Sequence, residues 1–285
     1  MNMFKKKINN FIIKAFNSFG LHLIKSRYSR WQLELYEEKK FLSKQPKYIN
    51  IGAGSFYHPL WHNMDMPNQF YKHAQIKPFI KYDISKKEQM KIKSNTVNLF
   101  YTSHLIEHLS DLDVKFMFKE VFRTLKKKGV FRITCPDMEL QYLAYKNKDL
   151  DFWTNLHPWG RDSSIESYSL EHKLVQHFAT CLCDKGRFKN LFLKKDEIIE
   201  LFSRHKMNDF FNIITSKIPQ GMNSLFPEGH INWFTFDKLS LMLKKVGFSS
   251  VFKSGYLQSK KSIMRDPRFF DSTCPELSFY VEAIK

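Results

Sequence analysis

The chain has 285 residues, of which 43% are hydrophobic, and it carries a formal net charge of +18 with an isoelectric point near 9.6. This length and apolar content exclude disorder over most of the chain and suffice for one large core, or for a core with a smaller lobe. The charge predicts an anionic partner, such as nucleic acid, an anionic membrane face or a phosphorylated substrate, unless it only reflects a compositional bias toward lysine.

The first predicted element is a basic amphipathic helix within residues 1–46. Its apolar side chains follow the spacing of one helical face: Phe4, Ile8, Phe11, Ile12, Ala15, Phe16 and Phe19. Lysines and asparagines fill the rest of this stretch, and Gly20 is a suitable C-terminal cap. Such a helix can lie in a membrane interface. Packing against the body of the protein or against a sister subunit is the alternative, and the sequence leaves both open.

Residues 47–138 read as alternating strands and helices. The expected elements are strands at 48–52, 95–103 and 130–135 and a helix at 114–125. We expect Gly129 to end that helix before the last of these strands begins. The alternation predicts right-handed crossovers between parallel strands.

Polar residues and glycines follow these strands and the short strands that we expect before Asp65 and Asp83. They are Gly52 and Gly54, Asp65, Asp83, Ser103 and His104, and Asp137. In open α/β sheets, ligands bind beyond the carboxyl ends of the strands, so this grouping predicts a binding site there. Each of these aspartates could alternatively be an ordinary helix cap or turn residue.

The glycine turn restricts the class of nucleotide or nucleoside that can bind. Gly52 and Gly54 flank one alanine, but the third glycine of the dinucleotide fingerprint is absent, and Asp65 follows Gly52 by only 13 positions. The fingerprint needs that third glycine and an acid about 20 positions on. We therefore expect a nucleoside without phosphates, whose ribose hydroxyls an acid would accept.

The rest of the chain divides into an insertion and a return to the core. Residues 139–228 are rich in aromatic residues and histidines, and we expect them to form an acceptor pocket or lid. An ordinary helical lobe or a subunit contact is the alternative. Residues 229–285 predict a helix that Gly247 ends, then a strand, then a final strand near the terminus.

Several segments together carry a family resemblance: NIGAGSFYHPLWHNMD, KYDIS, VNLFYTSHLIEHL, EVFRTLKKKGVFRITCPD and FYVEAIK. In order and spacing they resemble the class I S-adenosylmethionine-dependent methyltransferases, and in style the small methyltransferases of bacterial surface-polysaccharide biosynthesis. The resemblance covers 48–137 and resumes near Gly229. It implies a Rossmann-like α/β sheet, mostly parallel with an antiparallel last strand, with a helical insertion. One departure is Lys127-Lys128-Gly129, where the family often has Pro-Gly-Gly; this turn concerns the fold rather than the chemistry.

The resemblance also implies roles for individual residues. The turn Gly52, Ala53 and Gly54 would approach the methionine part of S-adenosylmethionine. Asp65 would bind the ribose, and Asp83 would lie near the adenine. Ser103 and His104 would lie close to the methyl group.

Histidine is the natural base for a hydroxyl acceptor, because its pKa is near neutral. His104 is the first candidate, as a base or as a group that orients the acceptor, and His172 and His230 are the next candidates. Glu-His pairs occur at 107–108 and 171–172, but no H-E-x-x-H or comparable ligand spacing accompanies them. The sequence therefore predicts no metal site.

The predicted function is a methyltransferase acting on a sugar hydroxyl or on an anionic phosphate or phosphoramidate group of a surface or capsular polysaccharide precursor. The alternative is a nucleic-acid methyltransferase or a basic RNA-binding protein. Against it, the chain has no Asn/Asp-Pro-Pro-aromatic motif and no recognisable RNA-binding module. A scaffold that binds no cofactor is a third possibility, and a homo-oligomer is compatible with all three.

Cysteine usage and hydropathy indicate the compartment. Cys135, Cys181, Cys183 and Cys274 form no C-x-x-C pair, which favours a reducing environment. No apolar run approaches the roughly 20 residues that span a bilayer, and Lys14 interrupts the only signal-like stretch. We expect a cytoplasmic protein, with contact to the inner membrane face through residues 1–20 as an added possibility.

Overall fold

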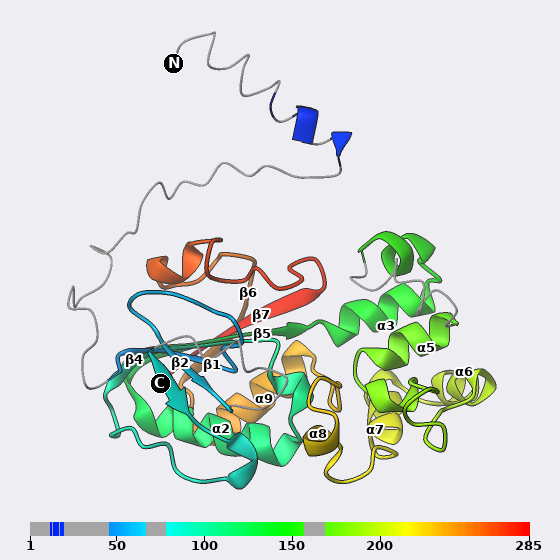
Figure 1. Cartoon of the computed structure of the whole chain (residues 1–285), viewed down its shortest axis with the longest axis horizontal. Coiled ribbons are helices and arrows are strands. Elements are labelled where there is room, and N and C mark those ends of the chain that lie inside the picture. Colours follow the sequence, from blue (N-terminus) through cyan, green and yellow to red (C-terminus); the bar gives the residue numbers. More distant parts are fainter. Residues whose placement is uncertain (1–11, 13, 17, 20–45, 67–77, 157–168) are drawn as a thin grey trace. The chain divides into compact units, whose positions relative to one another are not determined.

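The computed structural model describes residues 12, 14–16, 18–19, 46–66, 78–156 and 169–285 (Figure 1). The chain divides into two compact units, 1–39 and 40–285. Only six residues of the first unit are described, so the predicted amphipathic helix and its membrane contact lie mostly outside the described residues. In the described part of the chain, no helix is both long enough and apolar enough to cross a membrane.

The second unit is built on one seven-stranded sheet. Its strands are β1 (Tyr48–Ile51), β2 (His62–Asp65), β3 (Phe79–Lys81), β4 (Val97–Ser103), β5 (Leu125–Pro136), β6 (Ser250–Ser254) and β7 (Ser278–Ile284). The order across the sheet is β3-β2-β1-β4-β5-β7-β6. The pairs β2–β3, β1–β2, β1–β4 and β4–β5 are parallel, whereas β7 runs antiparallel to both of its neighbours. This confirms the predicted Rossmann-like sheet with an antiparallel last strand.

The helices fall into two groups. Those of the core are α2 (Asp111–Thr124) and α9 (Phe236–Val246), and those of the insertion are α3 (Met138–Lys146), α5 (Leu170–Gln176), α6 (Lys195–Arg204), α7 (Met207–Thr215) and α8 (Met222–Leu225). Short turns of other helix types are η3 (Ile84–Lys86), η4 (Ile106–His108), η5 (Phe152–Leu156), η6 (Thr180–Leu182) and η7 (Ser262–Arg265).

Helices α2 and α9 pack together on one face of the sheet (Figure 1). Ser110 caps α2, because its side chain accepts a hydrogen bond from the backbone N–H of Asp113. The apolar stripe of α2, including Phe118 and Val121, is fully buried with Phe131 of β5 and Leu239 of α9. Burial of each such side chain contributes about 1.5–3 kcal/mol, so this face fixes the sheet on which the site is built.

The connection between β6 and β7 packs against aromatic residues of β4 and of the loop after β1. Phe270, which is fully buried, lies 5.1 Å from the ring of Trp61, 5.2 Å from that of Tyr101 and 5.8 Å from that of Phe56, centroid to centroid. These contacts tie a segment late in the sequence to β4 and to the loop after β1. They place residues 268–273 at the carboxyl ends of the strands.

The junction between α2 and β5 differs from the sequence prediction. The helix ends at Thr124, and β5 begins at Leu125, so Gly129 lies inside the strand and does not end the helix. A side chain at Gly129 would come within 2.8 Å of the carbonyl oxygen of Lys126. The register of β4 against β5 also shifts in this region. The glycine is required by close backbone approach at an irregular strand pairing.

The insertion has a hydrophobic core of its own, separate from that of the sheet. Trp153, Phe178, Phe210 and Phe211 are fully or almost fully buried in it, and Trp233 extends it to the segment where the core fold resumes. The lobe therefore packs largely on itself. Its histidines need not lie at the strand ends, although the sequence places them between two parts of the core.

Candidate active site

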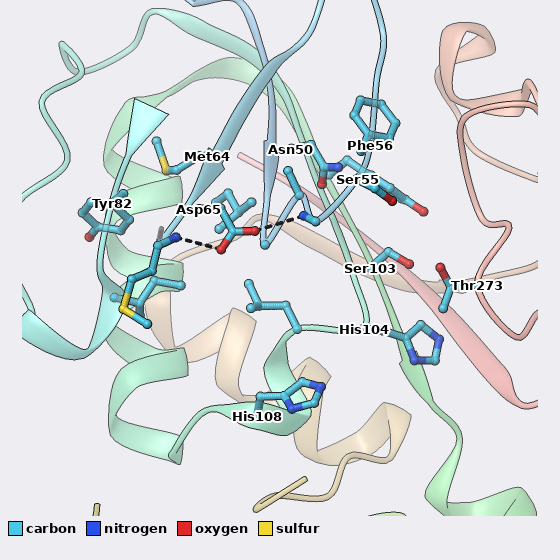
Figure 2. Close-up of a pocket in the computed structure, with 18 of the residues that line it drawn as sticks. Asn50, Ser55, Phe56, Met64, Asp65, Tyr82, Ser103, His104, His108 and Thr273 are labelled. Carbon is cyan, nitrogen blue, oxygen red and sulfur yellow. Dashed lines mark hydrogen bonds between the residues drawn. The ribbon is translucent and has the colours of Figure 1, made fainter. Parts of the chain in front are cut away.

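A cavity of about 820 Å³ opens at the carboxyl ends of β1, β2 and β4 (Figure 2). This volume is in the usual range for a site that holds a small organic ligand. The lining takes in the glycine turn with its aromatic neighbours, the ends of β2 and β3, the segment after β4, and parts of the insertion and of the β6–β7 connection. Every predicted cofactor-binding position lines it: Gly52, Ala53, Gly54, Asp65, Asp83, Ser103 and His104.

The backbone of the glycine turn has a conformation that favours glycine. Gly52 and Gly54 have φ angles of +66° and +50°, in the left-handed region that favours glycine. A side chain at Gly52 would lie 2.7 Å from the Leu105 side chain, so that position has no room for one. At Gly54 an added side chain would meet no atom within 4 Å. The open space above Gly54 lets a ligand approach the backbone directly.

Asp65 closes this turn from the end of β2. One carboxylate oxygen accepts the backbone N–H of Gly54 at 3.0 Å, and the other accepts that of Met66 at 2.7 Å (Figure 2). Burial raises the pKa of Asp65 above its usual value, and hydrogen bonds from the backbone of Gly54, Met66 and Ala53 oppose that rise. Each oxygen has a second lone pair, so the carboxylate can accept further hydrogen bonds from a ligand while it orders the turn.

Asp83 and Ser103 occupy different parts of the same wall. Asp83 caps the short turn η3, where one carboxylate oxygen accepts hydrogen bonds from the backbone N–H and the hydroxyl of Ser85, at 3.0 Å and 2.6 Å. Ser103 is the last residue of β4 and lies opposite Thr134 of β5 in the sheet. The turn role and the cavity position of Asp83 are compatible, because only one of its oxygens is engaged in these bonds.

His104 lies directly after β4 with a φ of +50°, which is rare for a residue other than glycine. Its backbone N–H donates to the carbonyl of Thr134 at 2.9 Å. Its Nδ1 lies 3.1 Å from a carboxylate oxygen of Glu107, and its Nε2 lies 2.7 Å from the hydroxyl of Ser278. Because both ring nitrogens contact protein atoms, the geometry favours the orienting role over the base role.

The turn η4 brings an unexpected group together beside His104. Glu107, His108 and His230 each offer one ligand atom, and these three atoms lie within 4.8 Å of one another. The rings of His108 and His230 meet edge to face, with centroids 4.7 Å apart. The sequence predicted no metal site, since His230 stands far from the Glu107–His108 pair along the chain. The fold removes that separation.

Burial and the neighbouring histidines together set the electrostatics of this group. Burial alone would raise the pKa of Glu107, but the hydrogen bond from His104 and the charges of His104, His108 and His230 bring it down to about 2. Burial lowers the pKa of His230 to about 4, with a further lowering from His108. At neutral pH the group therefore contains an ionised carboxylate and a neutral imidazole.

His172 lies elsewhere. It belongs to α5 in the insertion and is not among the residues that line the cavity. Its Nδ1 lies 2.9 Å from the hydroxyl of Ser169, and its Nε2 donates to the carbonyl of Leu193 at 2.9 Å. The ring also stacks on Phe192. These contacts give His172 a packing role, and its position does not support the prediction that it serves as a base.

Sequence reasoning missed the cavity residues that come from late loops. They are Arg268, Phe269, Ser272 and Thr273 of the β6–β7 connection and Asn223, Ser224 and Pro227 near α8. No motif marks them, because the β6–β7 connection is irregular and the four-residue α8, which holds Asn223 and Ser224, is too short to show a helical period. Three residues of the insertion therefore line the cavity, and the role of the insertion as an acceptor pocket or lid stays a prediction. The only sequence signal for the others was that the β6–β7 connection is long.

Comparisons with known proteins give structural likeness only. No protein-family model and no curated protein matches the chain. A solved SAM-dependent methyltransferase from Archaeoglobus fulgidus is 11% identical, with 86% of this chain and 88% of that chain covered and a TM-score of 0.40. One from Mesorhizobium loti is 11% identical over 85% and 91%, with a TM-score of 0.39. One from Aquifex aeolicus is 12% identical over 89% and 92%, with a TM-score of 0.38. At this distance, function has to be inferred from the site itself.

Proposed function

We propose that this chain is an S-adenosylmethionine-dependent methyltransferase. The observation that supports this most is the pairing of Asp65 with the glycine turn at one end of the cavity. A left-handed turn with open space above Gly54 suits a ligand that approaches the backbone closely. A half-buried carboxylate with lone pairs to spare, at the end of the neighbouring strand, suits the hydroxyls of a ribose.

The cavity residues fit the nucleoside part of this cofactor. Gly52 and Gly54 would lie against the methionine part, Asp65 would accept the ribose hydroxyls, and Asp83 with Tyr82 would border the adenine. The turn has no third glycine for a pyrophosphate, and the cofactor carries no phosphate. When bound, the cofactor would supply a methyl group on a sulfonium centre: an acceptor atom attacks the methyl carbon in line, and the C–S bond breaks to leave the demethylated thioether.

Alignment is the main contribution that the protein can make to such a displacement. We place His104 on the acceptor side of the site, because it lines the cavity directly after β4 while Glu107 and Ser278 fix both sides of its ring. A ring held in this way can orient an acceptor through one of its edges. The left-handed backbone of His104 is the local strain that this position requires.

The acceptor we propose is a hydroxyl-bearing or anionic small molecule, with a sugar or phosphate group of a surface-polysaccharide precursor as the specific case. Arg268 lines the cavity with its guanidinium paired to Asp266, and the net charge of +18 favours anionic substrates in general. Mass spectrometry of surface glycans from a deletion strain tests this acceptor: the expected result is the loss of one methyl group, and unchanged glycan methylation would contradict it.

Calorimetry with S-adenosylmethionine and its demethylated product tests the cofactor. We expect both to bind the wild-type protein and to raise its melting temperature. Asp65→Ala should weaken binding by about 1–3 kcal/mol, the scale of a hydrogen bond to a charged group. Asp65→Asn, which keeps an acceptor for the Gly54 N–H, separates the effect on the ligand from the effect on the turn. Asp196→Ala, at an exposed acid of α6, is the matched control and should bind as wild type.

The outcomes are distinct. If the wild-type protein binds neither compound, the proposed function is wrong and a scaffold role is favoured. If it instead retains RNA with a steep dependence on salt, the nucleic-acid alternative is favoured. If Asp65→Asn binds as tightly as wild type, the cofactor binds elsewhere or the acid plays no part.

A further inference from the structure

We propose that Glu107, His108 and His230 form a binding site for one divalent transition-metal ion of the zinc type, in the wall of the cavity. Two imidazoles and a carboxylate are a ligand set that such ions prefer. The site is new relative to the methyl-transfer function proposed above, which the residues around Asp65 support without it. Of the three residues, His108 lines the cavity, so an ion held here would be reached from the acceptor side.

The distances suit an ion. The three ligand atoms lie within 4.8 Å of one another. Ligands placed about 2.0–2.2 Å from a tetrahedral zinc ion stand about 3.3–3.6 Å apart. Side-chain movements of about one ångström would therefore close the group on an ion. Three protein ligands leave at least one coordination position open, which is the pattern of a catalytic rather than a structural site.

The two histidines are held in the orientation that metal ligands usually have. Nδ1 of His108 lies 3.1 Å from the carbonyl oxygen of Gly229, and Nδ1 of His230 lies 2.7 Å from that of His177. A carbonyl oxygen can only accept, so both Nδ1 atoms carry the proton and donate. In the neutral ring the lone pair is then on Nε2. Metal-binding histidines commonly donate the other ring N–H to a backbone carbonyl in this way, which fixes the tautomer and the ring.

The backbone holds the two halves of the site together. The carbonyl of Glu107 accepts the N–H groups of Ile231 and Asn232, at 2.9 Å and 3.1 Å. On the other side, His230 and Thr180 exchange two bonds: the N–H of His230 donates to the Thr180 hydroxyl at 2.9 Å, and the N–H of Thr180 donates to the carbonyl of His230 at 3.0 Å. The segment that carries His230 is therefore fixed between η4 and the insertion. A metal site requires its ligands to be held in place in this way.

The carboxylate of Glu107 provides a second, independent indication of a ligand. Glu107 is 1% exposed. One of its oxygens lies 3.1 Å from Nδ1 of His104, whereas Oε2 has no hydrogen-bond partner among the described residues. A buried carboxylate oxygen without a partner costs free energy unless something binds it. A cation between Glu107 and the two imidazoles would satisfy it.

Metal binding by the purified full-length chain, without an affinity tag, tests the site. After treatment with a chelator, Zn²⁺ is titrated by calorimetry and Co²⁺ by visible absorption, which reports the coordination geometry without any enzymatic assay. We expect one tight equivalent per chain. Glu107→Gln and His108→Gln keep the size of the side chain closely enough to fold, and each should weaken Zn²⁺ affinity more than the 10–100-fold typical of outer-shell partners. His205→Ala, at a half-buried histidine outside the group, is the control and should bind as wild type.

Two results would overturn the proposal: no tight equivalent in the wild-type protein, or variants that bind Zn²⁺ as the control does. Circular dichroism confirms folding, and if one variant fails to fold, the other decides. Any role of the ion in holding an acceptor oxygen rests on the proposed function, so calorimetry with S-adenosylmethionine is run in parallel on the metal-free and Zn²⁺-loaded protein. Metal binding without cofactor binding would contradict the proposed methyltransferase function and support the metal site. Cofactor binding without metal binding would contradict only the metal site.

Discussion

The chain contains the dipeptide Glu-His twice, and the two copies have different surroundings. In η4, Glu107 is buried with one oxygen unpartnered among the described residues, and His108 lines the cavity. In α5, Glu171 accepts the Tyr145 hydroxyl at 3.2 Å and lies 3.9 Å from the ammonium of Lys195. The ring of the histidine that follows Glu171 contacts a hydroxyl and a carbonyl through its two nitrogens.

The comparison of the two Glu-His pairs shows that residue type alone does not distinguish a binding site from residues that serve only in packing. In α5 the polar atoms of the pair have found protein partners, and the pair stabilises the lobe. In η4 a buried charged atom is left over next to His108, which lines the cavity. What distinguishes the two pairs is whether their buried polar atoms have hydrogen-bond partners. A buried polar atom without a partner lowers the stability of the folded protein, so selection for stability alone would remove it.

A third buried acid sets the scale of a fully partnered charge. Asp271 accepts Nε of Arg132 at 3.0 Å, and Arg132 also lies 3.1 Å from Glu282; the side chains of this ion-pair group are fully buried. Asp271→Ala leaves part of a buried guanidinium unpaired, and we expect it to lower the free energy of unfolding by about 3–5 kcal/mol. Urea denaturation measures this. A loss below about 1 kcal/mol would mean that buried pairing is a poor measure of structural importance in this protein.

His104 is the residue whose replacement should affect activity most. His104→Gln keeps a polar side chain of similar reach but not the fixed ring, and we expect turnover to fall about 10²-fold, the scale of an acceptor misplaced by about an ångström. Affinity for S-adenosylmethionine should change little, because the loss concerns the acceptor. Steady-state kinetics with the identified acceptor provide the measurement, and His172→Gln is the matched histidine control. Equal turnover in the two variants would remove the distinction between the two regions.

His172 should show the opposite profile. His172→Ala leaves the carbonyl of Leu193 without this donor, and we expect the free energy of unfolding to fall by about 1–3 kcal/mol. Binding of S-adenosylmethionine, measured by calorimetry below the melting temperature, should stay as in wild type. If stability is unchanged and turnover falls, His172 belongs to the site and the packing role assigned to it is wrong.

The smallest effect is expected at Glu107. Glu107→Gln removes a buried charge but keeps an oxygen that can accept from His104, so in metal-free protein the free energy of unfolding should change by less than about 1 kcal/mol. Urea denaturation in the presence of a chelator provides the measurement. A loss of about 3 kcal/mol or more, like that expected for Asp271→Ala, would show that the ionised carboxylate of Glu107 is stabilised by the protein beyond its contact with His104 and would erase the contrast with a fully partnered acid.

The sheet and one wall of the cavity can be predicted from the sequence alone. The alternation of apolar strands with an amphipathic helix requires parallel crossovers, and parallel strands end at the same edge. Gly52, Asp65, Asp83 and His104 can therefore be placed together from the sequence alone, because each lies at the end of a strand or just after it. This part is predictable since it depends on local periodicity and on one topological rule. At the lysine-rich junction before Gly129 the predicted helix end, Leu125, lies one residue beyond the observed one, but the role given to Gly129 and the predicted strand start at Val130 were wrong, because β5 begins at Leu125.

Which histidines lie close to Glu107 is evident only from the tertiary structure. His230 reaches Glu107 and His108 because backbone hydrogen bonds fix its segment between η4 and Thr180, and His172 is held away because the insertion has a hydrophobic core of its own. Likewise, Arg268 reaches the cavity because Phe270 packs on Trp61 and Tyr101. These contacts join residues far apart in the chain. They depend on how whole elements pack, and no local pattern in the sequence encodes them.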